Sequence, residues 1–441
     1  MNQLAPKHHF RLLMLLFHLI VINSLNGFSQ DPVLVGYWHN WDDVSAPYIP
    51  LEMVDERYDV ICLSFAIPSG PEDMSMQFVP DGATPSELAD QIQWLKDQGK
   101  TVAISVGGAN AEVNLDDEND QEAFVGSMTA MIDYYGFNGL DIDIEHGTSI
   151  LGTGGTISNP ANPAQLNLIA SVKEIMGNYY LENGEKLFLT ITPETAYVQG
   201  GQSSFGGIWG GYLPIVEGLR DSLDILQVQL YNSGTMFGID GGVYTQGTAD
   251  FVVAMTEAVI QGFSTSGGFF DGLPEDKVAI GLPACESAAG GGYLQPSEVL
   301  AAVQYIKGTG SQPGDYSLTD LTGYPDLAGM MTWSINWDAV ENCGEEYGYA
   351  QTFEEVFLDP LTALSEGKVG DMQVYPNPAK SFIQIELPDN YTGESVVVTD
   401  IAGRKLLSFP YNPGKELPVD GFSPGTYILH VGHRAIKWMK Q

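Results

Sequence analysis

The chain has 441 residues, too many for one ordinary domain, and its 44% hydrophobic content is enough to fill a complete core. Its formal charge is −38, and residues 31–370 alone hold 49 acidic against 9 basic side chains. So acidic a body repels nucleic acid and anionic membrane surfaces, which excludes both as partners and suits an uncharged or weakly cationic substrate.

The first thirty residues have the composition of an export signal. Lys7 and Arg11 are their only charged side chains, and the apolar run 12–22 that follows is too short to span a bilayer. Small residues occupy positions 27 and 29, where a signal peptidase would cut. We therefore predict a secretory signal peptide over residues 1–29, with an uncleaved anchor as the alternative. No later segment is long and apolar enough to span a membrane, so we expect no membrane span in the mature chain.

Eight short apolar segments then recur through the acidic body. They lie at residues 33–38, 58–66, 101–107, 138–145, 187–192, 224–231, 277–282 and 330–335. Helix-like stretches separate most of them, at residues 85–98, 121–135, 165–180, 216–223, 249–261 and 296–307. Strands that alternate with helices in this way predict an α/β fold, a (β/α)8 TIM barrel over residues 31–366. A doubly wound open sheet is the alternative, but no G-x-G-x-x-G follows the first strand.

The fourth of these segments, 138–145, reads NGLDIDIE and alternates acids with aliphatic residues. Side chains on a strand alternate between faces, so Asp141, Asp143 and Glu145 are expected to share one face. A solvated edge strand would show the same pattern. In a parallel barrel, however, both faces of a strand are covered, and three buried acids cost desolvation and repulsion. We therefore predict a functional site, with Glu145 at the C-terminal end of its strand, where barrels place working residues.

Three cysteines occur in the chain. Cys62 lies in an apolar run and is predicted to be a buried small hydrophobe. Cys285 and Cys343 could pair, although nothing in their spacing demands it. No cysteine and histidine cluster has zinc spacing, and we predict neither a metal nor a cofactor.

Near residue 370 the acidic excess ends, because residues 371–441 hold seven acids and seven bases. Short β-branched or alternating segments at 381–387, 395–399 and 426–431 are separated by turn signals at 389–390, 402–403, 412–414 and 423–425. This pattern predicts a small all-β sandwich domain over residues 371–441.

The acidic strand resembles the signature D-G-x-D-x-D-x-E of the family-18 glycoside hydrolases, which include chitinases. Five more segments resemble family strands in the expected order: GYWHNW at 36–41, LSFA at 63–66, SVGG at 105–108, QLYN at 229–232 and GMMTW at 329–333. The resemblance covers residues 33–338. Asn138 departs from it, because it replaces the first acid of the signature. We expect Asn138 to hydrogen-bond Asp141 and to alter proton sharing along the strand, and with it the pH optimum.

The resemblance implies a retaining, substrate-assisted hydrolase of β-1,4-linked N-acetylglucosamine. Glu145 would protonate the leaving oxygen, kept protonated by its acidic neighbours. The substrate's own N-acetyl carbonyl oxygen would attack the anomeric carbon. Asp143 would orient the acetamide N–H, Tyr231 would hold its carbonyl, and Asp141 would exchange a proton with Asp143.

The resemblance also implies a set of substrate-binding residues, namely Tyr37, Phe65, Gln229, Asn232 and Trp333. Trp333 would form the floor under the reacting sugar, although core packing is the alternative for it and for Tyr231. Trp209, in a glycine-rich loop, is a candidate platform for distal sugars. Trp38 and Trp41 have no preferred role, and Glu194 receives none.

The second domain has a resemblance of its own. VYPNPA at 374–379, DIAGR at 400–404, SPGTY at 423–427 and a basic end resemble the C-terminal sorting domain of the type IX secretion system. This implies the type IX machinery as a partner, and export across both bacterial membranes to the cell surface or outside. A carbohydrate-binding module is the alternative, but the aromatic residues here form no obvious row.

The leading hypothesis is therefore a secreted chitinase that acts on chitin or chitooligosaccharides. An endo-β-N-acetylglucosaminidase acting on N-glycans would use the same acids. An inactive chitin-binding lectin would typically lose the acid that Glu145 supplies. The last alternative is that the acid cluster binds a metal such as Ca²⁺.

Overall fold

The computed structural model describes residues 31–145, 148–152, 154–340, 343–358, 373–386, 395–400, 404–411, 414–431 and 434–441. The predicted signal peptide lies outside the described residues.

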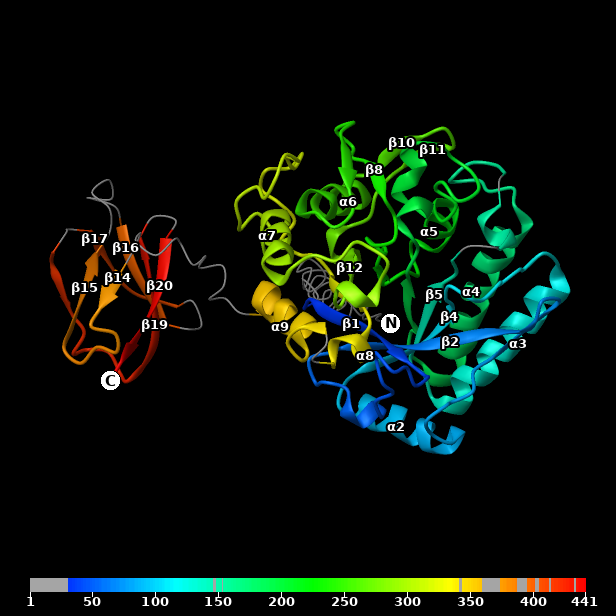
Figure 1. The fold of residues 1–441 in the computed structure, drawn as a ribbon, viewed down its shortest axis with the longest axis horizontal. Coiled ribbons are helices and arrows are strands. Elements are labelled where there is room, and N and C mark those ends of the chain that lie inside the picture. Colours follow the sequence, from blue (N-terminus) through cyan, green and yellow to red (C-terminus); the bar gives the residue numbers. More distant parts are fainter. Residues whose placement is uncertain are drawn as a thin grey trace, which may run out of the picture.

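Eight parallel strands form the centre of the first domain, in the order β12-β13-β1-β2-β4-β5-β6-β7. Their bounds are β1 Val33–His39, β2 Val60–Gly70, β4 Thr101–Gly107, β5 Gly139–Asp143, β6 Phe188–Ile191, β7 Ile225–Leu226, β12 Ala279–Pro283 and β13 Gly329–Trp333. Two parallel bridges, Leu226 to Val278 and Gln229 to Gly281, join the β7 end of the sheet to β12 and close the ring. In Figure 1 the strands lie inside a ring of helices, which confirms the predicted barrel.

The six helices between residues 85 and 306 overlap the predicted helix-like stretches, whereas the two short helices that begin after residue 334 were not predicted. They are α2 Pro85–Asp97, α3 Glu118–Tyr135, α4 Pro163–Asn183, α5 Leu213–Leu219, α6 Ala249–Gln261, α7 Pro296–Ile306, α8 Ile335–Asp338 and α9 Gly348–Phe353, followed by a π-helical turn Glu354–Leu358. Local signals set their ends. Asp117 caps α3 by accepting from the backbone N–H groups of Asn119 and Asp120, so the helix starts three residues before the predicted stretch. It ends at Gly136, whose φ of 74° suits glycine.

Two barrel strands are shorter than predicted by three residues or more. Strand β5 ends at Asp143, so Glu145 lies just beyond the strand instead of at its last position. The predicted strand 224–231 keeps regular pairing only at β7, and Gln229 then pairs through isolated bridges to Glu194 and Gly281. The carbonyl of Gln229 accepts from the Thr195 hydroxyl at 2.6 Å, so a side chain serves as its partner.

Three antiparallel strand pairings that were not predicted are added to the barrel. Strand β3 (Asp73–Gln77) pairs antiparallel with the end of β2. The hairpins β8–β9 (Thr235–Phe237 with Val243–Thr245) and β10–β11 (Phe263–Thr265 with Gly268–Phe270) lie at one edge of the view in Figure 1.

The cysteines behave as the sequence allows. Cys285, just after β12, forms a disulfide with Cys343, in the segment after α8. Cys62 is free and buried, as predicted.

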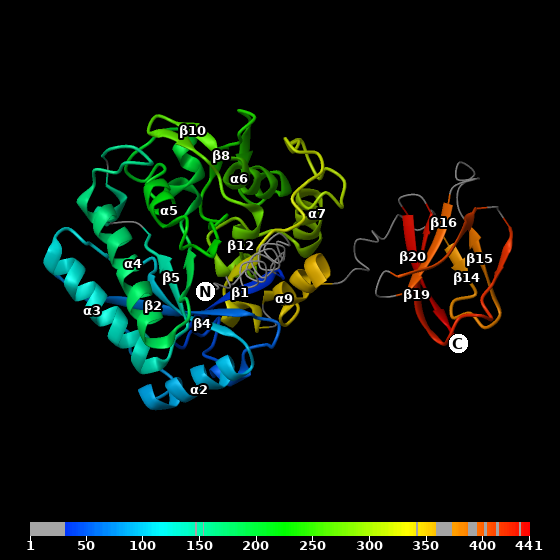
Figure 2. The same ribbon diagram turned by 180° about the vertical axis from the view of Figure 1, so that it is seen from behind.

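Two apolar clusters hold the barrel. One lies between the strands and the surrounding helices, and Figure 2 shows the helices around the sheet from behind as well. The other is inside the ring and includes Val35, Tyr37, Cys62, Ala103 and Met331. Because inward-facing residues fill the ring, the site is confined to its end.

The second domain is all β, as predicted. Its two antiparallel sheets are β14-β15-β18 and β17-β16-β19-β20. The bounds are β14 Gln373–Tyr375, β15 Phe382–Glu386, β16 Ser395–Asp400, β17 Lys405–Pro410, β18 Glu416–Pro418, β19 Gly425–Val431 and β20 Arg434–Lys440. The two sheets enclose their own core, in which Ile383, Val396, Leu429 and Trp438 are buried.

Candidate active site

Asp141 is fully buried and surrounded by hydroxyl groups from three strands. The hydroxyls of Tyr37 and Ser105 each donate to Oδ2 at 2.6 Å. Those of Thr190 and Thr192 donate to Oδ1 at 2.7 and 2.8 Å. Burial raises the pKa of Asp141, although these four donors counteract part of the rise. Because each oxygen accepts two bonds, the arrangement favours a carboxylate over a carboxylic acid here.

Asp143 is the second buried acid, and an amide rather than a hydroxyl contacts it. The Nε2 of Gln229 donates to Asp143 Oδ1 at 2.8 Å and lies 3.5 Å from Glu145 Oε1. Burial raises the pKa of Asp143 well above its usual value, and the charges of Glu145 and Asp141 raise it further. Burial and neighbouring negative charge thus favour the protonated form of Asp143, whereas the four hydroxyl donors favour the ionised form of Asp141.

Glu145 lies half-buried just past the strand, and a tyrosine fixes the residue before it. The hydroxyl of Tyr212 donates to the Ile144 carbonyl at 2.5 Å and accepts from the Ile144 N–H at 2.9 Å. Sequence reasoning missed Tyr212, which is 68 residues away from Ile144 and lies in no motif.

An aromatic cluster borders the acids. Trp333 and Phe65 stack with ring centroids 5.9 Å apart and planes 11° apart. Tyr37 packs against both rings, at 5.6 and 6.1 Å. Trp41 is 36% exposed and lies 6.4 Å from Trp333, so the structure adds it to the predicted set. Trp38, by contrast, is buried and donates to the Ile49 carbonyl at 2.8 Å, which is a structural role.

His39 lies beneath this cluster and was missed by sequence reasoning. Its ring is 4.7 Å from Trp41, nearly parallel to it, and 4.7 Å from Trp333. The side chain is only 3% exposed, and neither ring nitrogen has a hydrogen-bond partner. Burial lowers the pKa of His39 to about 4, so the ring is neutral above that pH.

Tyr231 is buried beside the acids, whereas Asn232 is exposed. Burial and the charges of Asp143 and Glu145 raise the pKa of Tyr231 well above its usual value, so its hydroxyl stays protonated. Gly292, at φ 102°, lies so close that a Cβ there would come within 2.5 Å of the Tyr231 Cα. Asn232 has a φ of 53° and donates its N–H to the Gly291 carbonyl. The structure thus brings Tyr231 to the acids but leaves Asn232 at the surface.

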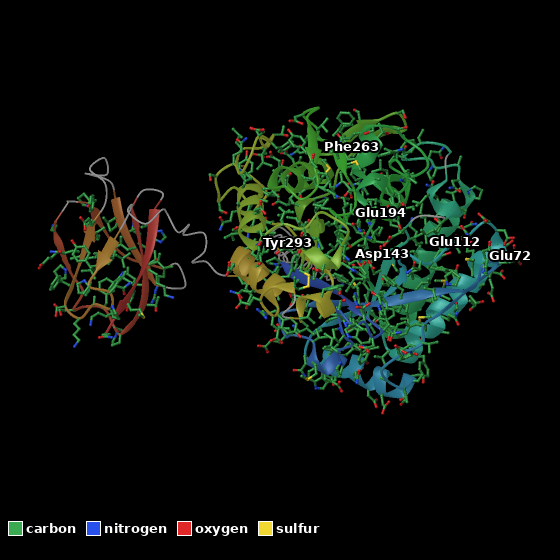
Figure 3. The ribbon with its side chains drawn as sticks, in the orientation of Figure 1. Glu72, Glu112, Asp143, Glu194, Phe263 and Tyr293 are labelled. Carbon is green, nitrogen blue, oxygen red and sulfur yellow. A yellow bond between two sulfur atoms is a disulfide. The ribbon has the colours of Figure 1, made fainter. Side chains whose placement is uncertain are left out.

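Glu194, which received no role from the sequence, belongs to the site. It follows β6, is half-buried and bridges to Gln229 through the backbone. Its charge contributes to the raised pKa values of Asp143 and Tyr231. Figure 3 shows Glu194 and Asp143 together within the ring of helices, whereas Glu72 lies at its outer edge.

The expected bond between Asn138 and Asp141 is wrong. Asn138 Oδ1 instead accepts from the Val102 N–H at 2.7 Å, and its Nδ2 lies 3.4 Å from the Lys100 carbonyl. Residues three apart on a strand point to opposite faces, so the Asn138 side chain faces away from Asp141.

Trp209 is 37% exposed and packs over Gly200, which belongs to the short 3-10 helix Gln199–Gln202.

In the part of the chain that the structure describes, no three His, Cys, Asp or Glu side chains are grouped to hold a metal ion. The chemistry of Asp141 disfavours a cation as well, because hydroxyl donors occupy the oxygens that a cation would need.

The fold is a (β/α)8 barrel, and its site consists of the acids of β5 and the aromatic side chains next to them. Residues 33–359 match the family model "Glycosyl hydrolases family 18". This chain belongs to that family.

Curated relatives agree with this assignment. The chain is 47% identical to "Chitinase Chi52" of Paenibacillus xylanexedens over 314 residues, which are 70% of this chain and 59% of the relative. It is 47% identical to "Chitinase D" of Niallia circulans over 326 residues, 73% of this chain and 61% of that protein. The chain thus spans about three fifths of the length of these two relatives. A solved family-18 chitinase from Chromobacterium violaceum has a TM-score of 0.65 and 33% identity, covering 74% of this chain and 83% of the other.

Residues 373–441 match the model "Secretion system C-terminal sorting domain". "Chitinase ChiA" of Flavobacterium johnsoniae is 36% identical over 415 residues, which are 87% of this chain and 26% of that protein. The sorting domain indicates type IX secretion and export to the cell surface or outside. None of the helices in the described ranges has both the length and the apolarity needed to cross a membrane.

Proposed function

We propose that this chain is a secreted chitinase that hydrolyses β-1,4 linkages between N-acetylglucosamine units with retention of configuration. The observation that carries the proposal is the environment of Asp143, which lies between a hydroxyl-caged Asp141 and Glu145 and accepts from Gln229. The printed names of the relatives support chitin as the polymer.

The geometry favours the acetamide of the substrate over a carboxylate as the nucleophile. Burial and the nearby charges of Glu145 and Asp141 raise the pKa of Asp143 and so favour its protonated form, which is a poor nucleophile. It can still hydrogen-bond the acetamide of a sugar, and Asp141 behind it supplies negative charge. Tyr231, whose hydroxyl stays protonated, donates to the acetamide carbonyl.

In the proposed first step, the sugar lies on Trp333 and Glu145 gives its proton to the glycosidic oxygen. The bond from the anomeric carbon to that oxygen breaks as the acetamide oxygen bonds to the same carbon, which forms an oxazolinium ion. Water then attacks from the vacated side, Glu145 takes its proton, and the ring reopens with retained configuration. The neutral His39 packs against Trp333 with ring centroids 4.7 Å apart and helps to hold this platform in place.

An endo-β-N-acetylglucosaminidase acting on N-glycans would use the same residues, and the experiment below separates the two activities. For export, we propose that residues 371–441 contact the type IX machinery and that residues 1–29 are the signal peptide.

The test is product analysis of the mature protein and its Glu145→Gln variant with chitooligosaccharides and with a high-mannose glycopeptide. Short N-acetylglucosamine oligomers from the wild type alone are the expected result. Release of intact glycan with the oligomers untouched would replace the proposal with the N-glycan activity. Cleavage of neither substrate, with retained binding, would indicate a lectin, and near-wild-type turnover by Glu145→Gln would remove Glu145 as the acid.

A further inference from the structure

The backbone around Ile144 is where the barrel and the reacting groups meet. Strand β5 pairs with β4 through Asp143 and with β6 through Ile142. The last backbone bonds of this edge run from Gly108 N–H to the Asp143 carbonyl and from Thr192 N–H to the Ile142 carbonyl. Ile144 is fully buried, yet both of its backbone polar groups bond to one side-chain hydroxyl, that of Tyr212.

These two bonds control two consecutive peptide planes. The N–H of Ile144 belongs to the peptide that leaves Asp143, and its carbonyl belongs to the peptide that enters Glu145. One hydroxyl at 2.9 and 2.5 Å therefore sets the orientation of the chain between the two acids. Beyond the end of regular pairing, such bonds decide where the next side chain points.

Tyr212 is itself held on several sides. It is the N-cap residue of α5, its N–H donates to the Tyr197 carbonyl at 3.0 Å, and its carbonyl accepts from Val216 at 2.9 Å. Its ring lies parallel to that of Tyr197, with centroids 6.1 Å apart. The side chain is fully buried, and burial with the nearby charge of Asp143 keeps its pKa well above the usual value. The hydroxyl therefore keeps its proton, and so its donor bond, over the working pH range.

We propose that Tyr212 is a positioning residue that sets the place of Glu145 relative to Asp143, an inference that rests on the proposed function. It touches neither substrate nor reacting atoms. Without the hydroxyl, the Ile144 N–H and carbonyl lose their buried partner, and the peptide planes rotate to find others. Glu145 is then displaced from the glycosidic oxygen, which slows the chemical step and leaves sugar binding on Trp333 intact.

The test compares Tyr212→Phe with Tyr349→Phe in the full chain, using chitooligosaccharides. Tyr349 is the matched control, because its buried hydroxyl also donates to a barrel-strand carbonyl, that of Met331 at 2.8 Å. Tyr212→Phe should lower kcat at least about tenfold with KM within about twofold, and should shift the limbs of the kcat–pH profile. Tyr349→Phe, which deletes one bond instead of two, should lower Tm by less and leave kcat and the pH profile unchanged.

A wild-type kcat for Tyr212→Phe, or equal losses of kcat in both variants, would overturn the inference. If Tyr212→Phe does not fold, Tyr212→His is used, since it keeps a ring at this position and its shorter side chain does not reach the Ile144 backbone. Its kcat should be reduced with KM unchanged, and a wild-type kcat would overturn the inference in the same way. Absence of turnover by the wild type itself would instead count against the proposed function.

Discussion

The Tyr37 hydroxyl donates to the Asp141 carboxylate at 2.6 Å, linking β1 to β5 across the inside of the barrel. Both side chains are essentially inaccessible to solvent. The bond places a hydrogen-bond donor beside Asp141, the deepest of the three acids, where it stabilises a negative charge on that carboxylate. Asp143 and Glu145 follow Asp141 toward the C-terminal end of the barrel, where Glu145 is half-buried.

Removal of one of the four hydroxyl groups that donate to Asp141 should change the pH dependence of the rate. Thr190→Val keeps the side-chain shape but deletes the 2.7 Å bond to Asp141. That bond stabilises the ionised form of Asp141, so its loss raises the pKa of Asp141. The acid limb of the kcat/KM–pH profile should therefore move to higher pH. For a bond worth about 1 kcal/mol, the shift is somewhat under one pH unit. Rate–pH profiles measure this. Thr352→Val, which deletes a bond to the Gly348 carbonyl, is the control and should leave the limb in place. If the acid limb of Thr190→Val stays at the wild-type pH, the hydroxyl donors do not set the pKa of Asp141 in this way.

His39 should make the barrel less stable in acid. Its pKa of about 4 lies below the ordinary value of 6.5, so the unfolded chain binds the proton first as the pH falls. Stability should therefore be lost between pH 6.5 and 4, by about 3 kcal/mol from this group. His39→Phe keeps an aromatic ring in contact with Trp41 and Trp333 and removes the titration. Urea unfolding at pH 4.5, 5.5 and 7 should show a flatter profile for the variant, and parallel profiles would contradict this account.

Asp338 should act with the opposite sign. The Tyr58 hydroxyl donates to Asp338 at 2.6 Å, and two backbone N–H groups also donate to it, which lowers its pKa. The effect of burial is larger and raises the pKa of Asp338 to about 6. Between pH 4 and 6 the folded state binds the extra proton, so stability should fall as the pH rises through this window, by about 3 kcal/mol. The measurement is the stability difference between wild type and Asp338→Asn, which should shrink over that window. A difference that stays constant with pH would show that Asp338 does not titrate there.

The two domains should be separable in function. The barrel core includes residues up to Val356, and the sandwich core begins at Val374. A chain that ends at residue 364 should keep kcat/KM on soluble oligosaccharides within about twofold, because each domain has its own core. Initial-rate assays beside the mature full chain test this. Loss of activity without loss of barrel folding would mean that the second domain contributes to catalysis.

Residue patterns were sufficient for the framework of this molecule. Alternation of acids and aliphatic residues placed Asp141 and Asp143 on the inner face of β5, and strand–helix periodicity predicted the closed barrel. The same parity rule, applied to Asn138, would have avoided the expected bond to Asp141. Capping signals such as Asp117 also fix a helix start more closely than apolar periodicity does.

The missing parts are contacts between distant segments with no shared motif. Tyr212 reaches Ile144 from a loop 68 residues away, and nothing in its neighbours marks it. Thr190 and Thr192 look like ordinary strand residues in the sequence, because their bonds to Asp141 form only when β6 pairs with β5. His39 looked like any residue at the end of a strand, because its contacts with Trp41 and Trp333 exist only after β1 and β13 pair.

Ring closure between β7 and β12 depends on two single bridges, and Gln229 makes one of them. The same residue donates its amide to Asp143. One residue therefore takes part both in the closure of the ring and in a contact with Asp143. A displacement of the Gln229 backbone at this bridge would also move the amide that donates to Asp143, so the packing of β7 beside β12 bears on the position of that donor.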